Sequence, residues 1–167
     1  RQFEDVDIVV SDCASCSGTL KHVGTYLADD PDWKDRAAAF SAKVMDLSEY
    51  LVKSGYTPRQ KSKAKITYHD PCHLCRGQGI KKEPLALLAA AGEYKEMKDS
   101  DVCCGGGGSF FMDYPDISDS IIDKKRRNIE ATGADVVVTG CPGCLIQLNK
   151  AAKASGKFKA LHISQVL

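Results

Sequence analysis

Eight cysteines carry the strongest chemical signal in this sequence. Five of them form one set, in which Cys72 is followed after thirty residues by Cys103 and Cys104, and after thirty-six more by Cys141 and Cys144. Thiolates are preferred ligands of iron–sulfur clusters and of zinc, and a closed tetrahedral zinc site uses only four ligands. Five thiols in one set therefore predict an iron–sulfur centre, with a structural zinc site as the alternative.

A second, smaller set consists of Cys13 and Cys16, in the spacing CxxC. These two have no further cysteines in their part of the chain, so we expect a second, incomplete metal site. Cys75 belongs to neither set. It could be an additional metal ligand or a buried cysteine that binds no metal, and the sequence does not distinguish the two. Two histidines, His69 and His73, lie next to the first cysteine of the larger set. Either could ligate metal, but the thiols suffice, so we expect them to form hydrogen bonds or pack.

Four glycines follow the adjacent cysteines, and we predict that Gly105, Gly106 and Gly107 shape the cofactor site. Neighbouring side chains of an extended segment point to opposite sides, so both thiols reach one centre only from a tight loop. Glycine permits positive φ angles and close approach of backbone N–H groups to sulfides. A phosphate-binding loop would end in Gly-Lys-Ser/Thr, which is missing here. A thioredoxin-like pair would use only Cys141 and Cys144.

The sequence alternates between short β-branched segments and amphipathic segments. We predict strands at residues 6–10, 64–69, 94–98, 135–139 and 159–163. We predict helices after Cys16 and at residues 32–53, 82–91, 115–131 and 144–153. This order favours a Rossmann-like α/β fold, with a mostly parallel sheet and helices on both faces. Each cysteine motif follows a strand, so we expect one crevice at the C-terminal ends of the strands to gather all five cysteines of the larger set.

Composition and charge limit the classes of function. The net charge is +1, which gives no indication of a nucleic-acid partner. We interpret the basic run Lys124-Lys125-Arg126-Arg127 as a solvated helix face rather than a docking patch for an acidic partner. No segment approaches the roughly twenty apolar residues of a membrane span. The length and regular periodicity argue against a disulfide framework, so we expect reduced thiols and a cytoplasmic protein.

An internal repeat relates the two CxxC segments. Residues 7–20 align without gaps on residues 135–148, and each passes from an apolar strand into CxxC and then into a helix. We therefore expect residues 1–57 to be the tail of a first repeat, with a strand, CxxC, a helix and a long helix. We expect residues 58–167 to be a complete second repeat, in one compact unit with the first. The start at Arg1 rather than Met leads us to expect a fragment of a longer protein.

The cysteine pattern resembles the cysteine-rich CCG domain of the heterodisulfide reductase type. It is more similar still to the C-terminal part of the iron–sulfur subunit of glycolate oxidase and related lactate dehydrogenases. The segments that carry this resemblance are His69-Asp-Pro-Cys-His-Leu74, Cys103-Cys-Gly105 and Thr132-Gly-Ala-Asp-Val-Val-Val-Thr-Gly-Cys-Pro-Gly-Cys-Leu145. The resemblance implies a [4Fe-4S] cluster, cubane or of the non-cubane kind, with the five cysteines of the larger set as its ligands.

The resemblance also implies a function. We expect an electron-transfer part of a lactate or glycolate oxidoreductase, rather than a complete enzyme, that passes electrons from a flavin domain to a quinone or a disulfide. Expected partners are a flavin-containing (FAD) oxidase domain or subunit and a ferredoxin-like iron–sulfur domain. Such partners would bring the protein to the inner face of a membrane. The alternatives are a structural zinc-binding or interaction domain and thiol–disulfide chemistry like that of heterodisulfide reductase.

Overall fold

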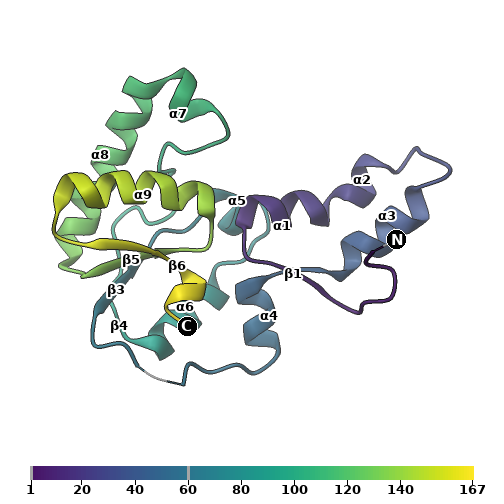
Figure 1. Cartoon of the computed structure of the whole chain (residues 1–167), viewed down its shortest axis with the longest axis horizontal. Helices are drawn as coiled ribbons and strands as arrows, with labels where there is room; N and C mark the ends of the chain where they lie inside the picture. Colours follow the sequence, from purple (N-terminus) through teal and green to yellow (C-terminus); the bar gives the residue numbers. More distant parts are fainter. Residues whose placement is uncertain (1, 60) are drawn as a thin grey trace.

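The computed structural model describes residues 2–59 and 61–167, which form parallel sheets flanked by helices (Figure 1). The first part of the chain contains β1 (Val9–Ser11), α1 (Ala14–Lys21), α2 (Val23–Tyr26), α3 (Lys34–Lys43), β2 (Val44–Asp46) and α4 (Leu47–Lys53). The rest contains β3 (Lys65–Tyr68), α5 (Cys72–Cys75), α6 (Lys82–Ala91), β4 (Glu93–Tyr94), α7 (Phe110–Asp113), α8 (Pro115–Thr132), β5 (Val136–Thr139), α9 (Pro142–Ser155), β6 (Lys159–His162) and η1 (Ile163–Gln165). The predicted α/β class is confirmed.

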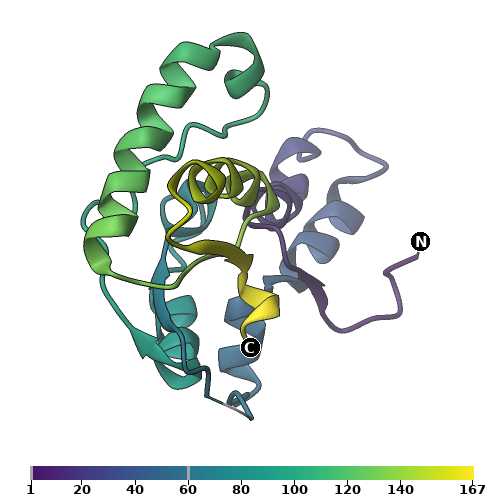
Figure 2. The ribbon, with the colours of Figure 1, turned by 60° about the vertical axis from the view of Figure 1, so that its left-hand side comes forward.

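Two sheets organise these elements. β1 pairs with β2, and the larger sheet has the order β4-β3-β5-β6, with every pairing between described strands parallel. Val137 and Val138 in β5 are fully buried, as expected for a central parallel strand covered on both faces. Ile129 of α8 and Leu148 of α9 share the core of Val137, whereas Leu88 of α6 shares that of Val138. Helices therefore cover both faces of this sheet (Figure 2).

Proline and glycine fix the ends of the two long helices beside the sheet. Pro115 and Pro142 stand in the first turns of α8 and α9, where a missing N–H leaves no helical hydrogen bond unmade. Gly133 and Gly156 follow these helices in the left-handed conformation, which favours glycine. Cys141 caps the N-terminus of α9, so its thiol lies at the positive end of the helix dipole.

The predicted helix over residues 32–53 is wrong. α3 ends at Lys43, and the buried strand β2 follows it, paired with β1, before α4 begins. The Asp46 carboxylate accepts a hydrogen bond from the Ser48 backbone N–H at 2.9 Å and so caps the start of α4. The apolar spacing that indicated one long helix therefore belongs to two helices separated by a strand.

Most other predicted elements occur with shifted ends. The helix predicted at residues 82–91 has the predicted bounds. In place of the strands predicted at 6–10 and 94–98, the structure has the shorter and shifted strands β1 (Val9–Ser11) and β4 (Glu93–Tyr94). The short helices α5 and α7 had no periodic pattern to predict them. None of the helices in the described part of the chain has the length and apolar character needed to cross a membrane. The first repeat was predicted to start at Arg1, which lies outside the described residues.

A pair of capping boxes extends the repeat beyond the CxxC segments. β2 leads into α4 through the reciprocal side-chain and backbone bonds of Asp46 and Glu49. β6 leads into η1 through the same arrangement of His162 and Gln165. Each strand–CxxC–helix segment is thus followed by a second parallel strand and a capped helical turn. This correspondence supports the internal repeat.

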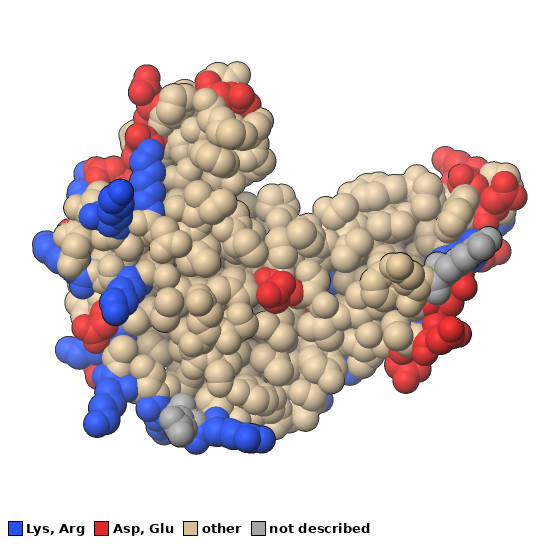
Figure 3. Space-filling view, viewed as in Figure 1, with Lys and Arg blue, Asp and Glu red and all other residues tan. Residues whose placement is uncertain are grey.

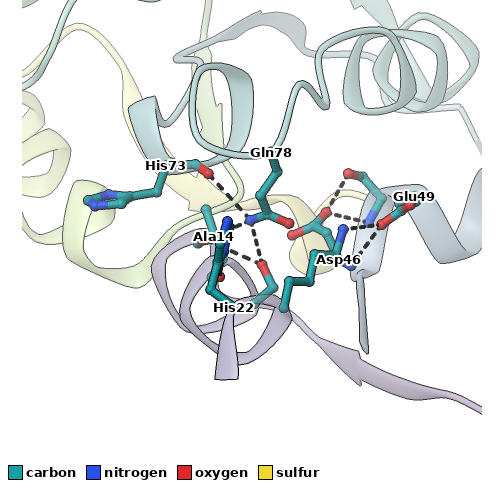
Figure 4. A network of polar contacts seen from close by, with 10 residues as sticks. Ala14, His22, Asp46, Glu49, His73 and Gln78 are labelled. Carbon is teal, nitrogen blue, oxygen red and sulfur yellow. Dashed lines mark hydrogen bonds and ion pairs between the residues drawn. The ribbon is translucent and has the colours of Figure 1, made fainter. Parts of the chain in front are cut away.

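The division of the chain into residues 1–57 and 58–167 stays a prediction, although a polar network joins the two parts (Figure 4). Gln78 Nε2 donates a hydrogen bond to the Ala14 carbonyl at 2.8 Å. The Ala14 backbone N–H donates in turn to the Gly140 carbonyl at 3.1 Å. The start of α1 is therefore held against the loop that precedes α9.

Candidate metal centre

One pocket of about 260 Å³ gathers all five cysteines of the larger set. Cys72 begins α5, just beyond the end of β3, and Cys103 and Cys104 lie in the loop between β4 and α7. Cys141 follows β5 directly, and Cys144 lies in the first turn of α9. The expectation that the five cysteines of the larger set meet at the C-terminal ends of parallel strands is confirmed.

The pocket has a buried floor and a partly exposed rim. Cys104, Cys141 and Cys144 are buried, whereas Cys72 and Cys103 are partly exposed. Figure 3 shows a hollow between the lobe of α7 and α8 and the arm of α1 and α2, with few charged side chains around it. Thiols of the rim can therefore be approached from solvent, while those of the floor are shielded.

Three lining residues were not predicted from the sequence. Ser15 comes from α1, Phe111 from α7 and Ile146 from α9. Ser15 lies inside the first CxxC, but nothing in the sequence indicated that this motif packs against the second one. Phe111 and Ile146 had no such signal, since their place at the pocket depends on how the helices pack.

The glycines after the adjacent cysteines permit close packing. Gly105 has φ of +81°, and a Cβ there would lie 2.9 Å from the Ser118 carbonyl oxygen. A Cβ on Gly106 would lie 3.1 Å from the Gly143 carbonyl oxygen, so this loop packs closely against the start of α9. Gly106 and Gly107 line the pocket, but Gly107 has open space around it. The cofactor-binding role of the three predicted glycines stays a prediction.

Hydrogen bonds between the thiols divide them into donors and acceptors. Hydrogen bonding from Cys103 and then from Cys144 holds the pKa of Cys104 well below its usual range. The same contacts raise the pKa values of Cys103 and Cys144. The pKa of Cys141 is lowered to about 5, chiefly by hydrogen bonding to Cys144, with help from backbone N–H groups that include that of Ser15. These shifts favour the thiolate form, which binds metal, at Cys104 and Cys141.

His69 completes the floor of the pocket. Its Nδ1 donates a hydrogen bond to the Ser100 carbonyl at 3.2 Å. A ring nitrogen of His69 lies within 4.8 Å of the Sγ atoms of Cys104 and Cys144, which are likewise within 4.8 Å of each other. All three side chains are buried, and Nε2 has no hydrogen-bond partner among the described residues. This donor set of thiols and an unpaired imidazole nitrogen fits a soft metal or an iron–sulfur cluster.

The remaining three cysteines do not line this pocket, whereas His73 lines it at the rim. Cys75 does not line the pocket, and burial raises the pKa of its thiol. Cys13 and Cys16 form a separate pair at the start of α1, where the Cys16 N–H donates to the Cys13 sulfur at 3.4 Å. Their role as an incomplete second site stays a prediction. His73 is exposed at the rim, with its Nδ1 3.7 Å from the Cys72 sulfur.

The interpretation of the basic run as a solvated helix face is wrong for Lys125. This side chain is 2% exposed, and its Nζ donates to the Ser100 carbonyl at 3.2 Å and to the Asp99 carbonyl. Burial lowers the pKa of Lys125. Arg127 of the same run is exposed and pairs with Asp123. Lys125 thus fixes the loop that also bonds His69, a role that a run of like charges does not reveal.

Residues 66–149 match the family model of the CCG cysteine-rich domain, so this chain belongs to that family. The similarity extends to curated relatives. Over 171 residues the chain is 35% identical to a probable glycolate oxidase iron-sulfur subunit of Bacillus subtilis, covering 98% of this chain and 38% of that protein. Over 170 residues it is 35% identical to lactate utilization protein A of Halalkalibacterium halodurans, covering 99% and 70%. The predicted family resemblance is confirmed.

An archaeal relative widens this group. Over 169 residues the chain is 36% identical to an uncharacterized iron-sulfur protein of Methanococcus maripaludis. The match covers 98% of this chain and 32% of that protein. The chain thus spans about a third of the length of two of these relatives and about two thirds of the other.

Proposed function

We propose that this chain is an iron–sulfur electron-transfer domain of a 2-hydroxy-acid oxidoreductase that acts on lactate or glycolate. The observation that carries the proposal is the convergence of five thiols in one pocket at the C-terminal ends of parallel strands. The names of the relatives, an iron-sulfur subunit of glycolate oxidase and a lactate utilization protein, support the substrate class. The chain supplies the electron-transfer part rather than a complete enzyme.

The proposed ligands are Cys72, Cys103, Cys104, Cys141 and Cys144, which would hold a [4Fe-4S] cluster, either cubane or non-cubane. When bound, such a cluster accepts and releases single electrons. The lowered pKa values of Cys104 and Cys141 present two thiolates without a further cost of deprotonation at neutral pH. The buried floor excludes water from these sulfurs, and hydrogen bonds from nearby N–H groups tune the potential.

The open rim provides the route for electrons. Partly exposed Cys72 and Cys103 lie beside the apolar side chains of Phe111 and Ile146, which a partner protein could cover. The proposed donor is an FAD-containing oxidase domain or subunit. The proposed acceptors are a quinone or a disulfide, with a ferredoxin-like iron–sulfur domain as a further partner. The assembly would work in the cytoplasm, held at the inner membrane face through its partners.

The domain organisation is part of the same proposal. Residues 1–57 would be the tail of a first CCG repeat, and residues 58–167 a complete second repeat. The matching capping boxes after each CxxC segment support this division. Cys13 and Cys16 would then be half of a second site, completed by residues outside this sequence.

The proposal is tested by reducing the protein through its expected donor. The chain is purified and reconstituted with iron and sulfide without oxygen, then mixed with a flavin-containing lactate or glycolate oxidase component of the same organism. Addition of the hydroxy acid should bleach the visible absorbance of the cluster, and omission of the flavoprotein should prevent this. A cluster that forms but is not reduced under any of these conditions would contradict the electron-transfer role.

A structural zinc site is the second candidate, favoured by the proximity of the His69, Cys104 and Cys144 donor atoms. Mixed thiolate and imidazole sets are common in closed zinc sites. Stoichiometric zinc that iron does not displace, without visible absorbance, would support a structural or interaction domain.

Thiol–disulfide chemistry is a third candidate, favoured by the lowered pKa of Cys141, about 5. Turnover of a small disulfide by the isolated chain would support it. Retention of that turnover by the metal-free wild-type chain, and its loss in metal-free Cys141→Ser, would separate this activity from electron transfer.

A further inference from the structure

The buried imidazole of His69 has one nitrogen that the protein leaves without a hydrogen bond. The residue is 1% exposed, and Nε2 has no hydrogen-bond partner among residues 2–59 and 61–167. Buried polar atoms are nearly always paired, because desolvation without a partner costs free energy. An unpaired nitrogen in the floor of a thiol-lined pocket therefore points to a group that the pocket is built to bind.

The hydrogen bonds around the other ring nitrogen, Nδ1, show that this nitrogen carries a proton. The Ser100 carbonyl accepts hydrogen bonds from His69 Nδ1 at 3.2 Å, from the Asp70 backbone N–H at 3.1 Å and from Lys125 Nζ at 3.2 Å. A carbonyl only accepts, so Nδ1 carries a proton, and in the neutral form of the ring Nε2 has the free lone pair. Histidines that bind metal typically donate their second ring N–H to a backbone carbonyl or a carboxylate in this way.

The lone pair lies among the buried thiols. A ring nitrogen of His69 and the Sγ atoms of Cys104 and Cys144 are all within 4.8 Å of one another. We take this nitrogen to be Nε2, because Nδ1 bonds the Ser100 carbonyl. His69 directly follows β3 and is tied to β5 by its backbone N–H, which donates to the Val138 carbonyl at 2.9 Å. Cys144 lies in the first turn of α9. Two of the three donors are therefore held by the sheet and a long helix, as a preorganised metal site requires.

We propose that His69 Nε2 is a ligand of the metal centre, beside Cys104 and Cys144. The inference rests on the proposed iron–sulfur function and adds an imidazole to a ligand set that the sequence predicted as five cysteines. His73, whose ring is exposed at the rim, does not share this role.

A purely structural role for His69 makes a different prediction. In that case Nε2 accepts a hydrogen bond from the Cys144 thiol, and the ring stays outside the coordination of the metal. Both roles keep His69 buried and both fix the loop at Ser100. Only direct coordination places the histidine nitrogen in contact with the unpaired electrons of a paramagnetic cluster.

Pulsed electron paramagnetic resonance on the reconstituted full chain separates the two roles. The protein is prepared with natural and with ¹⁵N-labelled histidine, and its spectrum is recorded in the paramagnetic oxidation state of the cluster. We expect a strong nitrogen coupling that changes with the isotope of the histidine. The chain has four histidines, and the coupling should persist in His22→Ala and in His73→Ala and vanish in His69→Ala.

The labelled wild-type protein decides the question even where His69→Ala does not fold. Iron and sulfide bound without a strong histidine coupling would overturn the inference and leave the proposed function in place. A coupling lost in His73→Ala would overturn it as well, by assigning the nitrogen to the rim. Absence of bound iron and sulfide in the wild type would remove the proposed function together with the inference.

Discussion

The two strand–CxxC–helix segments of this protein share a backbone plan and differ in what surrounds their thiols. In each, a cysteine occupies the N-cap position of the helix that follows a parallel strand, Cys13 before α1 and Cys141 before α9. Cys141 and Cys144 are buried, and the pKa of Cys141 is lowered to about 5. Cys16 is exposed, and hydrogen bonding to Cys13 is the main cause that raises its pKa.

The neighbouring strand accounts for the difference. β5 lies beside β3, whose C-terminal end brings His69 and Cys72 to the pocket. Within the described chain, β1 lies beside β2 alone, and the residue at the end of β2 is Asp46, which caps α4. A CxxC at a helix N-terminus is therefore only a part of the metal centre. The centre arises where adjacent strand ends supply further soft donors.

The largest expected effect is on iron content, and it should differ between a thiol removed from the second segment and a thiol removed from the first. Cys144→Ser should leave less than about a tenth of the wild-type iron, because a floor ligand is lost. Cys16→Ser should keep the iron content of the wild type, because its thiol lies outside the pocket. Iron and acid-labile sulfide per chain are measured after anaerobic reconstitution. Equal losses in both variants would contradict the comparison.

The glycine loop of the second segment provides a test of stability. Gly105→Ala should lower the free energy of unfolding by about 1–3 kcal/mol, because alanine is strained at φ of +81° and its Cβ would meet the Ser118 carbonyl. Gly107→Ala is the matched control, with open space for a methyl group and an expected change below about 0.5 kcal/mol. Denaturant unfolding of the metal-free protein measures both. Similar values for the two would show that the loop is not packed as described.

The contact between the two parts of the chain should be weaker. Gln78→Ala removes the donor to the Ala14 carbonyl and to Ser17 Oγ, which we expect to cost about 1 kcal/mol. Amide hydrogen exchange should rise in α1 more than in α9, because Gln78 holds the first segment against the second. Replacement of the exposed Asn149 by alanine is the control. Uniform exchange across both helices would argue against this role.

The smallest effect concerns a cap in the first segment. Burial raises the pKa of Asp46 above its ordinary 3.8, so the folded state binds this proton more tightly than the unfolded state. The contribution of Asp46 to stability is therefore full below pH 3.8 and is lost as the pH rises through the raised pKa. Asp46→Asn should gain stability relative to the wild type over that range, measured as unfolding free energy against pH. Parallel curves would contradict the assignment.

The sequence was sufficient for the class of fold and for the set of thiols in the pocket. The β-branched runs and the cysteines directly after them are local patterns, and parallel strand ends necessarily meet at one edge of a sheet. The strand β2 was hidden because its apolar residues continue the helical spacing of α3 and α4. Only pairing with β1, which is a long-range contact, distinguishes the two.

The polar part of the site was harder to predict than its thiols. His69 and Lys125 were each visible in the sequence, but their roles depend on the Ser100 carbonyl, which accepts a hydrogen bond from both. That loop lies between β4 and α7 and carries no periodic signal. Tertiary packing, rather than local pattern, therefore decides which basic side chain faces the thiols and which faces solvent.

The most direct test of the central claim is the iron and acid-labile sulfide content of the anaerobically reconstituted wild-type chain. A single centre in the second segment predicts about four irons and four sulfides per chain, with the visible absorbance of an iron–sulfur cluster. One tightly held zinc, without sulfide and without visible absorbance, would contradict the claim and assign the pocket to a structural site.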